Sequence, residues 1–487
     1  MTLVRSLLAA MLALAAVSAC AHRPPAPAAP SGPTPLAAAP AAPAWSSAEL
    51  RSLQARLRAA LGAPALANGG IAIVDGDGRP LYVRRERVAM TPASTFKVLA
   101  GAAALQTLGP EYRFSTTLES VDDPADGVIH GDVYLVGTGD PLFTRDDLRG
   151  GAAAVARGGV RAISGSIVAD ASVFSGPEVN PAWDPDDLQY GYAAGTSALS
   201  LDQGTVEFHL VPTVAGAPAR IRMLPPTDAV RVSGTVITSY ATLLSINRAA
   251  DRNDFAFDGR IAAGAEQSFW RPLVDLPRYA AGVARRMLRD RGVSVGGGVR
   301  TGVAPVAPYV LWRHRSPRLL DIVHEMMLES NNHFAEQLLR AIGATRGAGT
   351  EANGALVEKA VLARGGVPQQ GLRIVDGSGL APSDRVSAIT LATLLARTAA
   401  EPGGALFVGS LPRVGIEGTV RRRHVTDARG RARAKSGHIA DVNALAGYVE
   451  TRRHGRVSFA FIVNDRRADD LPVYVGVDRA LDILARS

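Results

Sequence analysis

Two side chains near the start of the chain have the types and the spacing needed for nucleophilic chemistry. Of the 53 lysines and arginines, only Lys97, Lys359 and Lys435 are lysines. Arginine keeps its proton in a protein, whereas a desolvated lysine can lose its proton and act as a base. Ser94 precedes Lys97 by three residues, so on a helix the hydroxyl and the amine would lie side by side. This spacing predicts a serine nucleophile with a lysine base.

The surrounding stretch predicts a helix that would position this pair. Pro92 and Ser94 are helix-start signals, an apolar run follows, and Gly109-Pro110 is a stop signal. The partial positive charge of a helix N-terminus would disfavour the protonated form of Lys97. A Ser-x-x-Lys match alone is more often an N-cap serine with an exposed lysine. The assignment therefore depends on the rest of the chain.

Ser330 and Asn332 lie within an otherwise helical pattern from 319 to 343. Side chains two residues apart can face one pocket only if the backbone turns there, at the end of a helix or between two helices. They would then hydrogen-bond a peptide backbone and relay a proton. Polar residues on a helix surface are the alternative, because Ser-x-Asn alone is a weak signal.

Lys435, Ser436, Gly437 and His438 precede two alternating apolar runs, which predict a strand followed by a hairpin. Lys435 and Ser436 would offer a cation and a hydroxyl to a substrate carboxylate. Gly437 would allow a substrate backbone to lie against the strand.

Two further stretches have ambiguous or misleading patterns. Residues 376–380 form a tight turn by composition, which is either a loop at the rim of a site or only a turn. Residues 292–296 match Gly-x-Ser-x-Gly, but a nucleophile elbow follows a strand and precedes a helix. Here a predicted helix precedes the motif and a β-like run follows it, so we reject Ser294 as a nucleophile.

The remaining elements predict an α+β chain with an insertion. Residues 46–61 have helical periodicity, and residues 71–83 read as a β-hairpin. From 114 to 274 short β-like runs alternate with Gly/Pro turns, which predicts a mostly β insert made of one or two small domains. We expect the domain that carries Ser94 to comprise residues 46–113 and 275–487.

The N-terminus predicts export. Arg5 is followed by an apolar run too short to span a bilayer, ending in Val-Ser-Ala-Cys20. This ending resembles a bacterial lipobox, which would make residues 1–19 a lipoprotein signal peptide and Cys20 the lipidated residue. An ordinary secretory peptide cut after Ala19 is the alternative. Residues 20–45, rich in Ala and Pro, predict a semi-rigid tether.

Composition narrows the classes of partner. A formal net charge of +8 on 487 residues is modest, and no nucleic-acid-binding motif accompanies the arginine clusters. The single cysteine excludes internal disulfides and Cys-rich metal sites. An anionic cell-wall glycopeptide is a compatible partner.

Ser94-x-x-Lys97, Ser330-x-Asn332 and Lys435-Ser436-Gly437, in this order, match the three motifs of penicillin-recognising serine acyltransferases. With a long β-rich insert after the first motif, the chain resembles the D-alanyl-D-alanine carboxypeptidase/endopeptidase family, the low-molecular-mass class C penicillin-binding proteins. The resemblance extends from about residue 46 to the C-terminus. Other stretches similar to that family are 139–141, 187–192, 329–332, 376–380 and 418–419.

The resemblance implies a serine β-lactamase/DD-peptidase-like fold, an antiparallel sheet flanked by helices. It also implies that Ser94 is acylated, that Lys97 is its base, and that Ser330 and Asn332 form the second motif. Lys435 and Ser436 would bind the substrate carboxylate, and the backbone N–H groups of Ser94 and His438 would form the oxyanion hole. The family more often has Thr at Ser436 and usually has Ser or Thr at His438.

We therefore expect an exported, periplasmic serine DD-peptidase, without metal or cofactor. It would cleave D-Ala-D-Ala ends or D-centred cross-links of peptidoglycan stem peptides and be acylated by β-lactams. A β-lactamase or D-peptide esterase shares these motifs, although the large insert argues against it. A catalytically weak wall-binding lipoprotein is a third reading.

Overall fold

The computed structural model describes residues 43–487 except 265, 307, 440 and 465–469. The predicted signal peptide, Cys20 and nearly all of the predicted tether lie outside these residues. In the part described, no helix has the length and apolar character needed to cross a membrane.

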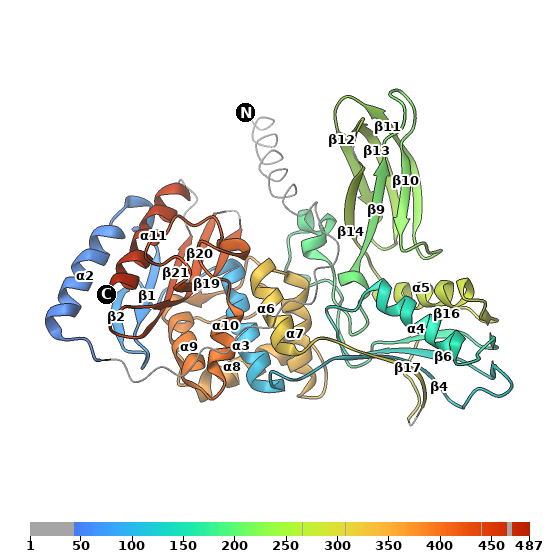
Figure 1. Cartoon of the computed structure of the whole chain (residues 1–487), viewed down its shortest axis with the longest axis horizontal. Helices are drawn as coiled ribbons and strands as arrows, with labels where there is room; N and C mark the ends of the chain where they lie inside the picture. Colours follow the sequence, from blue (N-terminus) through green and yellow to red (C-terminus); the bar gives the residue numbers. More distant parts are fainter. Residues whose placement is uncertain (1–42, 265, 307, 440, 465–469) are drawn as a thin grey trace.

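A five-stranded antiparallel sheet forms the centre of one half of the molecule (Figure 1). The strand order is β19-β20-β21-β1-β2. The strands are β19 (Ala432–Ile439), β20 (Val442–Glu450), β21 (Arg456–Asn464), β1 (Gly70–Val74) and β2 (Pro80–Arg84). The predicted hairpin therefore forms, and the predicted C-terminal strands lie in the same sheet.

Helices cover both faces of this sheet. Successive side chains of a strand point to opposite faces. Ile71 and Ile73 accordingly pack in one cluster with α2 (Ser47–Ala60) and α11 (Asp470–Arg486). Ala72 and Val74, between them, pack in a second cluster on the opposite face. The sheet is thus a central layer in an α+β fold, as predicted.

The second face supports a layer of helices around α3 (Lys97–Leu108), which follows the short 3₁₀ turn η2 (Ala93–Phe96). Phe96, Val98 and Leu99 are buried in this layer. The other helices of the layer are α6 (Leu319–Glu329), α7 (Asn332–Ala344), α8 (Glu351–Arg364), α9 (Ala388–Ala400) and α10 (Gly404–Ser410). Burial of the apolar run after Ser94 therefore fixes the start of α3 in this layer.

The insert forms the other half of the molecule (Figure 1). Its main sheet is mixed, in the order β16-β8-β6-β4-β17. The strands are β4 (Ser115–Ser120), β6 (Val133–Gly137), β8 (Ile167–Asp170), β16 (Val299–Thr301) and β17 (Tyr309–Arg315). Helices α4 (Arg145–Arg157) and α5 (Leu276–Asp290) pack in the same hydrophobic cluster as this sheet.

Three smaller sheets complete the insert. One joins β5 (Val128–Ile129), β7 (Ala162–Ile163) and β15 (Ser294–Val295). The second contains β9 (Thr205–Val211), β10 (Arg220–Leu224) and β14 (Gln267–Pro272). The third contains β11 (Arg231–Ser239), β12 (Leu243–Arg248) and β13 (Asp254–Ala262). The last two project from the rest of the molecule (Figure 1).

The insert is longer and more helical than the sequence predicts. Residues 276–315 belong to it, because β16 and β17 pair with β8 and β4 and because α5 packs on its core. The chain returns to the first half at α6, not at residue 275. Helical periodicity marks a buried face but does not tell which core that face will join. The expected boundary was therefore placed too early.

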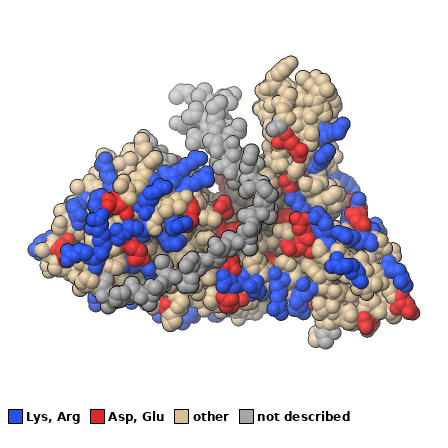
Figure 2. All heavy atoms as spheres, viewed as in Figure 1, with Lys and Arg blue, Asp and Glu red and all other residues tan. Residues whose placement is uncertain are grey.

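Charged side chains are spread over both halves of the face shown in Figure 2. Basic groups there are interspersed with acidic ones, and the projecting sheets carry few charges on this face. The mixture of both signs of charge agrees with arginines that are solvated surface groups.

Candidate active site

Ser94 and Lys97 lie side by side, as their three-residue spacing predicts. Lys97 Nζ is 2.9 Å from Ser94 Oγ. Ser94 is half-buried at the 3₁₀ turn η2, whereas Lys97 is fully buried at the first residue of α3. The hydroxyl is therefore within hydrogen-bond reach of an amine that water does not contact.

Two other oxygens bind the same amine. Lys97 Nζ donates to Asn332 Oδ1 at 2.7 Å and to the Ser378 carbonyl at 3.0 Å. A neutral amine has two N–H bonds and one lone pair. If the two N–H bonds point to these oxygens, the lone pair is left for the proton of the Ser94 hydroxyl. The arrangement suits a general base.

Burial favours the neutral form of this amine. Desolvation lowers the pKa of Lys97 to about 8, against the opposing attraction of the Asp376 and Glu336 carboxylates. A general base works best when its pKa is close to the operating pH. The site thus gives Lys97 the proton affinity that its predicted role requires.

The backbone turns between Ser330 and Asn332, as the sequence requires for a shared pocket. Helix α6 ends at Glu329, and Ser330 has the left-handed φ of 61°. Asn331 caps α7 by accepting the Phe334 N–H, and Asn332 is the first residue of that helix. Asn332 reaches Lys97, but the Ser330 hydroxyl makes no hydrogen bond to Ser94 or Lys97 within the described chain.

Strand β19 runs directly beside Ser94. A Cβ atom added to Gly437 would lie 2.8 Å from the Pro92 carbonyl oxygen and 3.0 Å from the Ser94 amide nitrogen. Such contacts are too close for any side chain, so glycine is required for this approach. Gly437 therefore brings the strand and the serine together, rather than only leaving room for substrate.

The neighbours of Gly437 are placed around this contact. Lys435 is fully buried, and its Nζ donates to the Ser436 carbonyl at 2.7 Å. Burial, and then the charge of Lys97, lowers the pKa of Lys435 well below its ordinary value. A substrate carboxylate would favour the charged form again. The Ser436 hydroxyl donates to Thr419 Oγ1 at 2.7 Å, and His438 Nδ1 lies 3.1 Å from Asn443 Oδ1.

Gly437→Ala tests this close approach. The new methyl group would push β19 away from η2, and a displacement of about 1 Å can slow an enzyme by about 10²-fold. We expect labelling by fluorescent penicillin to slow by that order. Gly150→Ala is the matched control, because a Cβ at this exposed position on α4 contacts nothing within 4 Å. A folded Gly437→Ala protein with the wild-type labelling rate would contradict the expectation.

A segment of the insert contacts the catalytic half at the start of α7. The Tyr192 carbonyl accepts from Asn332 Nδ2 at 2.9 Å, and Gln203 Oε1 accepts from Asn331 Nδ2 at 2.7 Å. The Ser197 carbonyl accepts from Gln337 Nε2 at 2.9 Å. No side-chain motif in the insert indicates a reactive site, so the sequence does not predict these positioning contacts. Two of the three acceptors are backbone carbonyls, which every residue has, so no residue type in the sequence marks them.

The loop at residues 376–380 is part of the site but is not at its rim. Asp376 and Ser378 are fully buried, and the loop supplies the carbonyl that binds Lys97. Gly379 has a φ of +78°, and a Cβ there would lie 2.0 Å from the Ala93 carbonyl oxygen. The turn therefore packs beneath η2, next to the nucleophile.

The antiparallel sheet with helices on both faces is typical of the serine β-lactamase/DD-peptidase class of folds, to which this chain adds the insert. The crystal structure of penicillin binding protein 4 (dacB) from Haemophilus influenzae is similar, with a TM-score of 0.78 and 24% sequence identity. The similarity covers 89% of this chain and 99% of that one. The predicted fold class is thus confirmed.

The particular family follows from the sequence comparisons. The model of the D-Ala-D-Ala carboxypeptidase 3 (S13) family matches residues 53–481. A D-alanyl-D-alanine carboxypeptidase of Actinomadura sp. (strain R39) is 34% identical over 453 residues, which cover 88% of this chain and 84% of that protein. A D-alanyl-D-alanine carboxypeptidase of Haemophilus influenzae is 27% identical over 78% of this chain and 82% of that protein. The chain belongs to the D-Ala-D-Ala carboxypeptidase 3 (S13) family, which confirms the resemblance.

Proposed function

We propose that this protein is a serine DD-peptidase that acts on peptidoglycan stem peptides through an acyl-enzyme on Ser94. The observation that carries the proposal is the 2.9 Å contact between Lys97 Nζ and Ser94 Oγ beside β19. Membership of the carboxypeptidase family supports it. The Haemophilus influenzae protein of the same fold has also been crystallised with a β-lactam, which supports covalent inhibition of this chain by such compounds.

In the first half-reaction, neutral Lys97 takes the proton of the Ser94 hydroxyl. Ser94 Oγ attacks the carbonyl carbon of the penultimate D-alanine, and the backbone N–H groups of Ser94 and His438 stabilise the oxyanion. The C–N bond then breaks, and the leaving amine takes up the proton. Before this step, Lys435 and Ser436 hold the terminal carboxylate, which fixes the scissile bond over the serine.

In the second half-reaction, water attacks the ester on Ser94. Lys97 again accepts a proton, now from the water, and Ser94 Oγ leaves with a proton. The products are the shortened peptide and free serine. The same steps on a cross-link would separate two stem peptides, so the chemistry allows endopeptidase action as well. Asn332 keeps the lysine amine aligned in both half-reactions through its 2.7 Å contact.

Digestion of purified peptidoglycan, with the products identified by mass, tests this function. Carboxypeptidase action would remove one D-alanine from pentapeptide stems, and endopeptidase action would convert cross-linked dimers to monomers. A time course with a β-lactam separates a peptidase, which stays acylated, from a β-lactamase, which turns the compound over. If the protein binds the polymer but neither removes D-alanine nor converts dimers to monomers, it is a wall-binding lipoprotein and the proposal is wrong.

The rate of acylation should depend on pH through Lys97. Because the neutral amine is the base and its pKa is about 8, the rate should rise with pH and level off above that value. Two pH units below the pKa, about 1% of the amine is neutral, so acylation near pH 6 should be about 100-fold slower than at the plateau. Stopped-flow measurement of penicillin acylation across this range checks the profile. A flat rate between pH 6 and 8 would remove Lys97 from the role of base.

We also propose that the protein is exported to the periplasm and anchored through a lipid on Cys20. The lipobox-like ending of the N-terminal apolar run and the Ala/Pro-rich tether support this. Recovery of the protein in the membrane fraction, with a lipid mass on the peptide that begins at Cys20, is the expected result. A soluble mature protein that begins at Cys20 without lipid would contradict the anchor.

A further inference from the structure

A second residue of α7 lies behind the catalytic amine. Glu336 stands four residues after Asn332, so the two side chains share one face of the helix. It is only 2% exposed. A buried carboxylate is costly unless hydrogen bonds satisfy it, so its partners show what holds it there.

Those partners are backbone N–H groups of the buried loop at 376–380. Glu336 Oε1 accepts from the Ser378 N–H at 2.9 Å, and both carboxylate oxygens lie 3.1 Å from the Gly377 amide nitrogen. The next peptide group is fixed at both ends. Its carbonyl, on Ser378, accepts from Lys97 at 3.0 Å, and its N–H, on Gly379, donates to Asp376 at 2.6 Å.

We propose that Glu336 is a positioning residue for the lysine base. It holds the loop so that the Ser378 carbonyl occupies one N–H of Lys97, while Asn332 occupies the other. The remaining lone pair then faces Ser94. A single helix, α7, thereby sets both acceptors, one directly through Asn332 and one through the loop. This inference rests on the proposed function of the Ser94–Lys97 pair.

The charges around Glu336 come from several elements. Burial raises the pKa of Glu336, helped by the nearby Asp376 carboxylate, while the hydrogen bonds from Ser378 and Gly377 oppose this rise. Glu351 raises it further, and Glu336 in turn attracts the proton on Lys97. The other titratable groups of the cluster are Glu358 on α8, Asp384 after the loop and Arg340 on α7.

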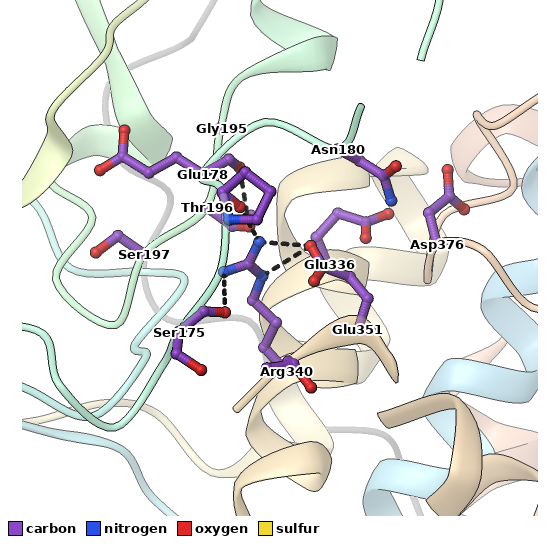
Figure 3. Close-up of polar contacts among 12 residues, drawn as sticks. Ser175, Glu178, Asn180, Gly195, Thr196, Ser197, Glu336, Arg340, Glu351 and Asp376 are labelled. Atoms are coloured by element: carbon purple, nitrogen blue, oxygen red, sulfur yellow. Dashed lines mark hydrogen bonds and ion pairs between the residues drawn. The ribbon is translucent and has the colours of Figure 1, made fainter. Parts of the chain in front are cut away.

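Arg340, one turn further along α7, is occupied elsewhere. Its Nε donates to Glu351 at 3.1 Å, and its guanidinium also donates to the Ser175 carbonyl at 3.4 Å (Figure 3). It therefore ties the insert to α7 and makes no hydrogen bond to Glu336 in the described structure. The loop N–H groups are the hydrogen-bond donors to this carboxylate.

Glu336→Gln tests the proposal, because the amide has nearly the same volume but presents an NH₂ group to the loop N–H groups. The Ser378 carbonyl should shift, and we expect penicillin acylation at the high-pH plateau to slow by about 10- to 100-fold. Where Glu336 is ionised, the substitution also removes a negative charge that raises the pKa of Lys97, so the midpoint of the pH profile should move to lower pH. A merely structural role would lower thermal stability but leave the plateau rate of the folded protein near the wild-type value.

Glu358→Gln is the matched control. Glu358 is also a fully buried carboxyl in this cluster, but neither of its oxygens has a hydrogen-bond partner among the described residues. The acylation rate of the Glu358→Gln protein and the midpoint of its pH profile should stay close to those of the wild type. If both Gln variants slow equally, replacement of any buried carboxyl group in this cluster explains the effect, and the positioning role is wrong.

Glu336→Asp provides a second variant if the Gln protein does not fold. It keeps the charge but shortens the arm, so the plateau rate should fall while the midpoint stays near the wild-type value. Wild-type rates in both folded Glu336 variants would overturn the inference alone. A wild-type protein that penicillin does not acylate, or an acylated Ser94→Ala protein, would instead overturn the proposed function.

Discussion

Replacing Ser94 with alanine is expected to abolish covalent labelling by penicillin and to lower D-alanine release by on the order of 10⁴-fold or more. The loss is large because the acyl-enzyme cannot form without the hydroxyl, and the other oxygens that Lys97 Nζ contacts in the described structure, Asn332 Oδ1 and the Ser378 carbonyl, are not nucleophilic hydroxyls. Labelling is read on a gel with a fluorescent penicillin. Release of D-alanine from a D-Ala-D-Ala peptide is measured separately. The Ser94→Ala protein should remain folded, since this side chain is half-buried and the substitution removes only its hydroxyl oxygen.

Ser294→Ala is the matched control for that experiment. Ser294 belongs to the Gly-x-Ser-x-Gly match, but it lies exposed on β15 in the insert, paired with β7. Its removal should leave labelling and D-alanine release unchanged. If Ser94→Ala is labelled as strongly as the wild type, Ser94 is not the nucleophile. Loss of activity in Ser294→Ala would make Ser294 a candidate nucleophile again, although the elements around it stand in the wrong order for a nucleophile elbow.

Lys97→Met should reduce acylation by on the order of 10³- to 10⁴-fold, because the general base is lost while the serine remains. The methionine side chain has a similar length and no charge to bury, so the helix layer should accommodate it. Lys97→Arg should be equally slow, since a guanidinium keeps its proton at every working pH. Rapid-mixing measurement of penicillin acylation gives both rates, and thermal unfolding shows whether each variant is folded.

Lys359→Arg is the control for the lysine variants. Lys359 is exposed on α8 and is one of the three lysines in the chain. Its replacement should leave the acylation rate within about twofold, as surface substitutions usually do little. Acylation by Lys97→Met at the wild-type rate would show that another group deprotonates Ser94, and the mechanism would have to be abandoned.

Periodicity and motif order determine most of the elements and the family. The apolar run at 71–74 and the alternating runs at 443–450 and 457–464 predict strands that the structure places in one sheet. Three motifs in the right order predict a fold that the comparisons confirm. They also single out Ser94, Lys97 and Asn332, which the structure brings into contact. Local patterns suffice here because helix phase and strand alternation are set by near neighbours.

The sequence alone does not show which core a segment joins or which backbone atoms face the site. Helical periodicity predicts α5, but its packing on the insert depends on distant residues. The Ser378 carbonyl contacts Lys97, and the Ser378 N–H contacts the Glu336 carboxylate, only after α3, α7 and the loop have packed together. Every residue has a backbone carbonyl, and the sequence does not distinguish a buried glutamate from an exposed one. Only tertiary packing assigns these groups their partners, because the contacts join residues 41 to 281 positions apart.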